Sequence, residues 1–227
     1  MHLSVVIPTL DEAARIGDRL RELAALGIDD VIVADGGSRD GTLEVVRAHR
    51  GARLVSASRG RGPQQNAGAR AATGDVVLFL HADVQLPADA TTWIERTLAD
   101  PAVVAGAFRV RTVADDGWNW LGPVLRMADL RSRHTRMPYG DQAVFVRRVV
   151  FEQVGGFPDE PLMEDVVLAR RLLAVGRLVT VPAYVRASGR RFLQRPIASV
   201  LAMWTFPTLH RLGVSPRVLA RLYGRPR

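Results

Sequence analysis

The sequence predicts an α/β fold in which a mostly parallel sheet is flanked by helices. Strand-like and helix-like apolar patterns alternate from residue 3 to residue 98, as is typical of parallel sheets. The pattern at Val76–Leu80 is apolar at every position, which indicates a strand covered on both faces. With 227 residues and 48% apolar content, the chain is long enough to bury a full core as one domain.

Two β-α units open the chain. Leu3–Pro8 has the pattern of a buried strand, and Ala13–Leu26 has apolar residues at helical spacing. Val31–Ala34 predicts a second strand, which a polar turn at 36–41 connects to a helix at Thr42–His49. We expect Thr42 itself to cap that helix, because threonine is a favoured N-cap residue.

The same reasoning continues along the chain, except at 112–137, where weak periodicity leaves the topology open. The further expected elements are a strand at Arg53–Ala57, a helix at Pro63–Ala72, the strand at Val76–Leu80, a helix at Ala88–Leu98, strands at Val103–Val110 and Ala143–Arg147, and helices at Val149–Val154 and Glu164–Val175. The last 30 residues are expected to be helical and basic.

Positive charge is concentrated at the end of the chain. The net charge is +8, yet all 23 acidic residues precede residue 166, and the remainder carries 12 arginines. We predict one domain at residues 1–189 and a basic amphipathic helical tail at 190–227. This tail could lie on an anionic membrane surface, or it could pack its apolar face on the core. No basic platform studded with aromatic residues indicates a nucleic-acid partner.

The sequence favours a cytoplasmic protein, with peripheral contact at the inner face of the membrane if the tail lies on lipid. It has no cysteine, so disulfides and thiolate catalysis are excluded. The start of the chain lacks the charged region of a signal peptide. The apolar run Ile197–Leu209 is interrupted by Pro207 and is shorter than the roughly 20 residues that span a bilayer.

Acidic residues follow the predicted strands. Asp35 comes after Val31–Ala34, Asp83 comes after Val76–Leu80, and Glu164-Asp165 begins a helix. The carboxyl ends of parallel strands form the ligand crevice of such sheets. These carboxylates therefore suggest a divalent metal, a sugar nucleotide and a catalytic base in one cleft. Asp83 could alternatively be an ordinary turn residue.

The loops after the first two strands could hold a nucleoside. Pro8-Thr9-Leu10-Asp11-Glu12 places polar groups where they could grip a base or ribose, although Thr9 or Asp11 could equally be a helix N-cap. Asp35 could accept hydrogen bonds from a base or ribose, with Gly36 allowing close approach. An NAD-binding loop is excluded, because the first turn lacks Gly-x-Gly-x-x-Gly.

Taken in order, the motifs resemble glycosyltransferase family 2. They are Val6-Ile7-Pro8-Thr9-Leu10-Asp11-Glu12, Asp35-Gly36-Gly37-Ser38 with Asp40-Gly41-Thr42, Asn66-Ala67-Gly68, His81-Ala82-Asp83, Gly140-Asp141-Gln142 and Met163-Glu164-Asp165. Arg59-Gly60-Arg61-Gly62, Gln65-Asn66 and Ser188-Gly189-Arg190-Arg191 are similar to a bacterial subgroup associated with arsenosugar biosynthesis.

The resemblance implies a GT-A (Rossmann-like) fold, a nucleotide-diphosphate sugar donor, a divalent cation (Mg²⁺ or Mn²⁺) and inversion at the anomeric carbon. By position, the resemblance assigns donor binding to Pro8, Thr9, Leu10, Glu12, Asp35, Gly36 and Ala82. It makes Asp83 both a donor-site residue and the metal ligand. Asp165 would be the catalytic base, beside Glu164. His81 stands where many members have an aspartate, so the number of protein ligands to the metal stays open.

Other residues could complete the site. Gly140, Asp141 and Gln142 would lie between donor and acceptor, and Arg59, Arg61, Arg190 and Arg191 are candidates to approach the donor. Each arginine could instead be simply solvated. Glu164 and Asp165 could also serve only the positive end of their helix dipole.

These observations predict a metal-dependent inverting glycosyltransferase that moves one sugar per turnover to a hydroxyl or phosphate of a small-molecule or lipid-linked acceptor. A processive synthase is not expected, because the chain lacks the Gln-x-x-Arg-Trp motif of such relatives. A nucleotidyltransferase and a non-catalytic module that binds sugar nucleotide or membrane are the alternatives.

Overall fold

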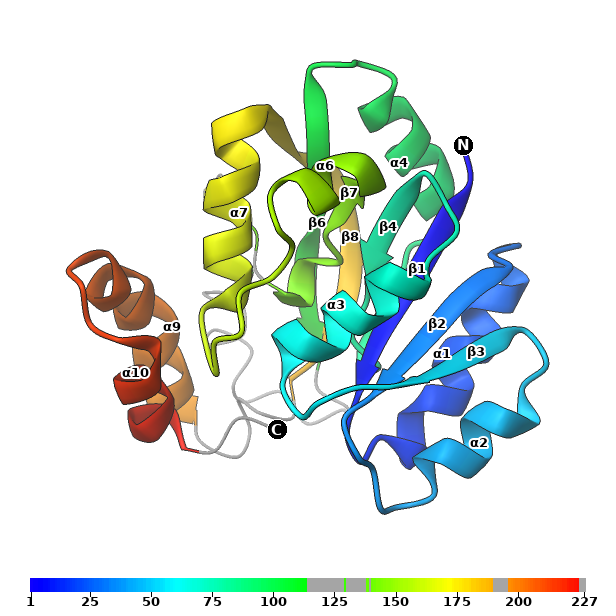
Figure 1. The fold of residues 1–227 in the computed structure, drawn as a ribbon, viewed down its shortest axis with the longest axis horizontal. Helices are drawn as coiled ribbons and strands as arrows, with labels where there is room; N and C mark the ends of the chain where they lie inside the picture. Colours follow the sequence, from blue (N-terminus) through cyan, green and yellow to red (C-terminus); the bar gives the residue numbers. More distant parts are fainter. Residues whose placement is uncertain (114–128, 130–137, 139, 190–195, 225–227) are drawn as a thin grey trace.

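The computed structural model describes residues 1–113, 129, 138, 140–189 and 196–224. In these residues the strands form one eight-stranded sheet in the order β3-β2-β1-β4-β7-β6-β8-β5. The strands are β1 (Leu3–Thr9), β2 (Asp30–Asp35), β3 (Ala52–Ser56), β4 (Val76–Phe79), β5 (Val84–Gln85), β6 (Val103–Val113), β7 (Phe145–Arg147) and β8 (Arg177–Ser188). The predicted α/β class is confirmed (Figure 1).

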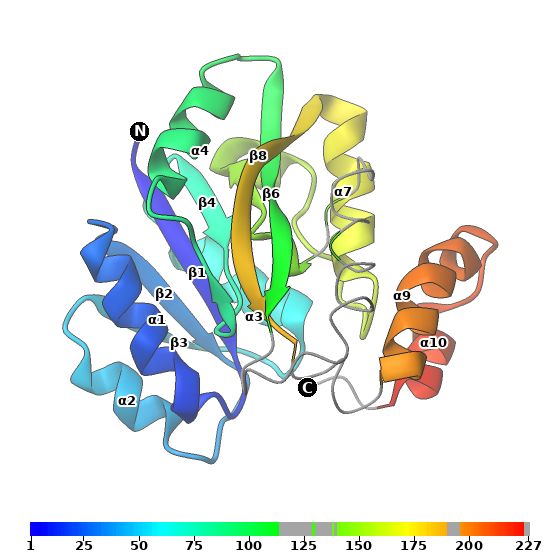
Figure 2. The same cartoon turned by 180° about the vertical axis from the view of Figure 1, so that it is seen from behind.

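Helices cover both faces of this sheet. They are α1 (Ala13–Ala25), α2 (Thr42–Ala48), α3 (Arg61–Ala71), α4 (Ala90–Leu98), α6 (Arg148–Gln153), α7 (Glu164–Val175), α9 (Pro196–Arg211) and α10 (Pro216–Tyr223), with a short 3-10 helix at Gly140–Gln142. The helices α3, α6 and α7 lie on the face seen in Figure 1, whereas α1, α2 and α4 lie on the face seen in Figure 2.

The sheet is parallel in its first half and mixed in its second. β1 pairs parallel with β2 and β4, and β2 pairs parallel with β3. β7 runs antiparallel to β4 and β6, while β8 is parallel to β6 and antiparallel to β5. The carboxyl ends of β1, β2 and β4 therefore meet at one edge, as the alternation of strands and helices predicts.

Successive side chains of β1 point to opposite faces of the sheet and so contribute to two separate parts of the core. Val5 and Ile7 pack with Ile16 of α1 on one side, whereas Val6 packs with Phe151 of α6 and other residues on the other. Because a Cβ at Gly68 would lie 2.3 Å from Val6 Cγ1, glycine there is what lets α3 approach β1. The loop that follows β1 is thus held by a tightly packed layer.

Several elements differ from the sequence-based expectations. Helix α3 begins at Arg61, before the proline, and β8 was not predicted at all. The N-cap of α2 is Gly41 and not Thr42. The N-cap of α1 is Glu12, without a side-chain hydrogen bond, so neither Thr9 nor Asp11 caps that helix. Helix α7 has the predicted bounds.

The two C-terminal helices form a pair beside α7 (Figure 1). Ala202 and Phe206 of α9 pack with Leu219 of α10 and with Leu162, which precedes α7. The tail thus packs part of its apolar surface against the residues that precede α7. Among the helices described, none is both long and apolar enough to cross a membrane.

Candidate active site

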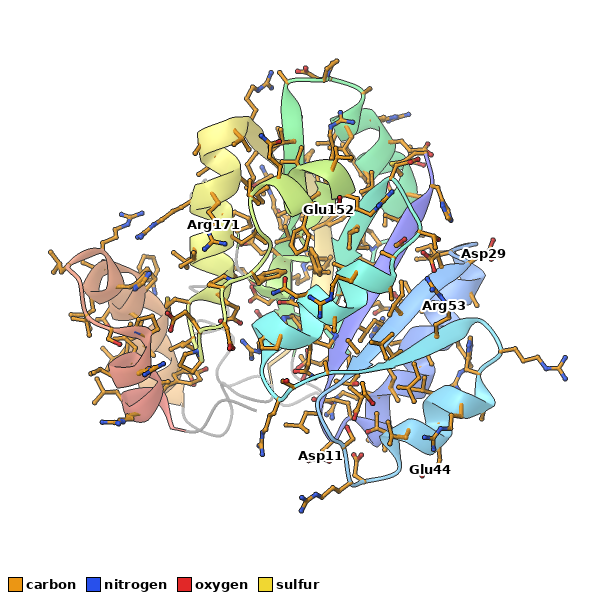
Figure 3. The ribbon with its side chains drawn as sticks, in the orientation of Figure 1. Asp11, Asp29, Glu44, Arg53, Glu152 and Arg171 are labelled. Atoms are coloured by element: carbon orange, nitrogen blue, oxygen red, sulfur yellow. The ribbon has the colours of Figure 1, made fainter. Side chains whose placement is uncertain are left out.

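The first two loops at the sheet edge are joined by hydrogen bonds. Asp11 N donates to Ser38 Oγ (2.9 Å), and Arg39 N donates to the Asp11 carboxylate (2.8 Å). Ala13 N donates to the Asp40 carboxylate (3.0 Å). Figure 3 shows Asp11 beside the turn that follows β2. Backbone donors of each loop are thus satisfied by side chains of the other, which fixes the shape of the edge.

Asp35 is turned into its own loop. Its carboxylate accepts hydrogen bonds from Gly37 N (2.8 Å), Ser38 N (2.9 Å) and Ser38 Oγ, and the residue is only 4% exposed. A contact from Asp35 to a nucleoside was predicted, but in this arrangement the carboxylate is occupied by the turn. Its neighbour Gly36 leaves room for Gln64, whose Nε2 would lie 2.9 Å from an added Cβ.

A small cavity of about 30 Å³ lies at the ends of β1 and β4. Its described lining is Pro8, Thr9, Leu10, Glu12, Arg61, Gln64, His81, Ala82 and Asp83. The structure therefore brings together most of the residues predicted to bind the donor. Gln64 was missed by sequence reasoning, and it donates hydrogen bonds to the carbonyls of Thr9 (2.5 Å) and Ala34 (3.1 Å).

A larger cavity of about 200 Å³ adjoins the first and shares Arg61, His81 and Asp83 with it. Its polar side also includes Thr112, Gly140, Asp141, Asp165, Ser188 and Ser199. Its apolar side comprises Val84, Leu162, Met163, Ala187, Ala202, Phe206, Pro207 and Tyr223. The tail helices thus contribute to the cavity wall, which the sequence does not indicate, because a periodic apolar face does not reveal its partner.

Asp165 is held at the start of α7 with both carboxylate oxygens engaged. One oxygen accepts from Gly140 N (2.9 Å) and the other from Val166 N (2.8 Å). A carboxylate has about four acceptor positions, so these two bonds orient the group and leave it able to accept a further hydrogen bond. A Cβ at Gly140 would lie 2.8 Å from His81 Nε2. Glycine therefore allows Asp165 and His81 to face one cavity.

Arg61 lies between the two cavities and pairs with Glu164. Arg61 Nη1 is 3.8 Å from Glu164 Oε1, and the Glu164 side chain is largely buried. Glu164 does not line the larger cavity, whereas its neighbour Asp165 does. The arrangement gives the two predicted catalytic carboxylates different positions: Asp165 faces the cavity, and Glu164 faces Arg61.

The remaining predicted residues are placed differently. Gln142 is 1% exposed and donates to the Phe108 carbonyl (2.9 Å), so its side chain lies in the core and lines neither cavity. Arg59 is exposed and lines neither cavity. The predictions for Arg190 and Arg191 fall outside the described residues.

The side chains that could bind a metal suit an ion that keeps substrate and water among its ligands. Within the described residues no group of three or more His, Cys, Asp or Glu side chains could hold a metal ion. Asp83 and His81 nevertheless line both cavities. Mg²⁺ usually takes one or two carboxylates and fills its other positions with phosphates and water. The residues present therefore fit a cation that binds together with a diphosphate.

Three non-glycine residues of the described chain have positive φ, and all flank the site. They are Asp11 (φ 55°) in the first loop, Ala143 (φ 47°) after the 3-10 helix, and Met163 (φ 69°) before Glu164. Such residues carry an energetic penalty and often occur at functional sites. Their distribution supports a functional assignment for these loops.

The fold and the cavities at the carboxyl edge of its strands define a protein of the GT-A class. Residues 4–155, more than half of the chain, match the family described as "Glycosyl transferase family 2". The chain belongs to this family, as its motifs predict.

Two solved structures support the fold. A mannosyltransferase, PcManGT from Pyrobaculum calidifontis, in complex with GDP-Man and Mn²⁺, is 26% identical with a TM-score of 0.69, covering 98% of this chain and 68% of that one. S. aureus TarS 1-349 in complex with UDP-GlcNAc is 19% identical with a TM-score of 0.65, covering 83% and 58%.

A curated relative is also similar in sequence. The undecaprenyl-phosphate 4-deoxy-4-formamido-L-arabinose transferase of Pseudomonas aeruginosa is 29% identical in an alignment of 164 positions, which covers 66% of this chain and 48% of the relative. The chain thus spans about half the length of the curated relative.

Proposed function

We propose that this protein is a metal-dependent, inverting glycosyltransferase that moves one sugar from a nucleotide-diphosphate donor to a hydroxyl or phosphate of the acceptor. The observation that carries the proposal is the position of Asp83. This carboxylate lines both the cavity beside Pro8, Thr9 and Glu12 and the larger cavity that contains Asp165. A nucleoside held beside Pro8, Thr9 and Glu12 would place its diphosphate near Asp83 and its sugar near the base.

Asp165 is proposed as the base for a hydroxyl acceptor. It takes the hydroxyl proton while the oxygen attacks the anomeric carbon, and the bond from that carbon to the diphosphate oxygen breaks on the opposite face. The electron pair leaves with the nucleoside diphosphate. Because Gly140 N and Val166 N already hold the carboxylate, its orientation is set before the acceptor binds.

Charge on the departing diphosphate needs stabilisation. Arg61 lies where the cavities meet, and a guanidinium can bind phosphate oxygens with two hydrogen bonds. Asp83, with His81, would hold the divalent cation, which when bound neutralises charge on the leaving group. The Mn²⁺ and GDP-Man bound by the 26% identical mannosyltransferase support this assignment.

The acceptor is proposed to be a small or lipid-linked molecule in the larger cavity, near Gly140 and Asp141. The undecaprenyl-phosphate transferase among the relatives supports the lipid-linked option. Three statements stay predictions from the sequence: the boundary between domain and tail at residue 189, the cytoplasmic location, and the link to arsenosugar biosynthesis.

The proposal is tested by thermal unfolding with a panel of nucleoside diphosphates and sugar nucleotides, each with Mn²⁺, Mg²⁺ or EDTA. A ligand at 100 times its dissociation constant stabilises the folded state by about 2.7 kcal/mol. We expect a shift with one base, which EDTA and Asp83→Ala remove. No shift with any donor, or a shift indifferent to metal and to Asp83, would contradict the proposal.

A further inference from the structure

The tail helices have two different surfaces. The inward surface contributes Ala202, Phe206 and Tyr223 to the larger cavity. The outward surface bears large apolar side chains in water: Leu201 is 58% exposed, Trp204 47%, Leu212 77%, Val218 45% and Leu222 69%. The other large apolar residues exposed in the described chain are Met1, Val149, Leu173 and Val175, all outside the tail helices. A surface so enriched in apolar side chains indicates a binding partner.

The chemistry of the outward surface specifies that partner. In α10, Arg217 and Arg221 share the exposed face with Val218 and Leu222, while Leu219 and Ala220 are buried. Arg211 is also exposed, at the end of α9. Residues 166–227 contain no acidic residue. Exposed apolar side chains interspersed with arginines, and with no acidic residue among them, are complementary to a surface that is both apolar and negatively charged.

We propose that the exposed faces of α9 and α10 dock on a bilayer that contains anionic lipids. Leucine side chains and Trp204 would enter the region below the headgroups, where tryptophan is favoured, and the arginines would contact lipid phosphates. Residues 196–223 contribute to both the docking surface and the cavity. If the acceptor is lipid-linked, as the proposed function holds, docking would bring the cavity to it.

Sedimentation with vesicles tests the docking without any need for a known acceptor. The probes are vesicles of phosphatidylcholine alone and vesicles that also contain phosphatidylglycerol. Wild-type protein is expected to sediment with the anionic vesicles only, and less at high salt, because salt screens the arginine contacts. Failure to bind the anionic vesicles would overturn the proposal.

Variants on the exposed face locate the contact. Arg217→Gln/Arg221→Gln and Leu212→Ser/Leu222→Ser should each weaken binding about tenfold or more. The matched controls are Arg70→Gln/Arg96→Gln and Val149→Ser, which change residues exposed on other helices. Binding by the tail variants that equals binding by the controls would contradict docking through α9 and α10.

Tryptophan emission provides a second readout. Anionic vesicles should shift the emission of wild-type protein to shorter wavelength, and Trp204→Phe should lose this shift while still sedimenting. An unchanged shift in Trp204→Phe would contradict the insertion of α9. Donor-induced thermal stabilisation, measured without vesicles, reports on the proposed function independently, so the two hypotheses fail separately.

Discussion

The two halves of the site use their carboxylates differently. In the first half, Asp11, Asp35 and Asp40 accept hydrogen bonds from backbone N–H groups of the loops after β1 and β2. In the second half, Asp83 and Asp165 line the larger cavity. Asp165 also accepts backbone hydrogen bonds, so position is what separates the two groups. Asp11, Asp35 and Asp40 shape the loops, whereas Asp83 and Asp165 face a cavity.

The largest effect is expected for Asp165→Asn. This change keeps the size of the side chain and an acceptor for Gly140 N but removes the base, so sugar transfer should fall by about 10² to 10⁴-fold. Rates of nucleoside diphosphate release with each candidate acceptor measure it. Asp29→Asn, at an exposed position, is the control. If Asp165→Asn transferred sugar at near wild-type rates, Asp165 would not be the base and the two halves of the site would not differ in function.

A framework aspartate should instead affect stability. Asp30 is buried and accepts hydrogen bonds from Ser4 Oγ (2.5 Å), Thr73 N (2.9 Å) and Arg53, which is labelled in Figure 3. Asp30→Asn should lower the free energy of unfolding by about 2 kcal/mol, as measured in urea. Donor binding by the protein that remains folded should be unchanged. A loss of donor binding would mean that Asp30 acts in the site and does not only stabilise the fold.

Acid should weaken the same framework. Burial acts to raise the pKa of Asp30, but hydrogen bonds from Ser4, Thr73 and Arg53 outweigh it and hold that pKa well below its ordinary value. Burial also acts to raise the pKa of Asp40, but hydrogen bonds from Thr42 and Ala13 outweigh this effect and lower that pKa. Since the unfolded chain binds protons first, stability should decline as pH falls below about 4. Urea titrations at several pH values test this, and Asp30→Asn should show a shallower decline.

The smallest effect is expected from the arginines. Arg61→Gln should raise the KM for the donor by about tenfold, because Arg61 lines both cavities. Arg59→Gln should leave it unchanged, because Arg59 is exposed and lines neither cavity. Equal effects of the two substitutions would mean that the larger cavity is not where the diphosphate binds.

The sequence predicted the parallel half of the fold better than the mixed half. Leu3–Pro8 and Val76–Leu80 are apolar runs, which mark them as buried strands by local composition alone, although they pair with each other across about 70 positions of the chain. β8, which pairs with β6, was missed because its burial alternates only in its second part. Local periodicity carries little information on such pairing.

The site shows the same limit. Motif position was sufficient to predict that Pro8, Thr9, Asp83 and Asp165 lie at neighbouring cavities. It could not indicate that the carboxylate of Asp35 is occupied by Gly37 N and Ser38 N, because side-chain hydrogen bonds depend on the turn geometry. The wall formed by α9 and α10 depends on packing between Leu162 and Phe206, which no motif covers.

The most direct test of the account is calorimetric titration of the nucleotide sugar, with Mn²⁺ present, into wild-type protein, Asp83→Asn and Asp165→Asn. We predict that Asp165→Asn binds the donor as tightly as wild type although it transfers sugar about 10² to 10⁴-fold more slowly, and that Asp83→Asn loses the part of the affinity that depends on the metal. Equal affinities for all three proteins, or weak binding by Asp165→Asn alone, would contradict the roles assigned to the two carboxylates.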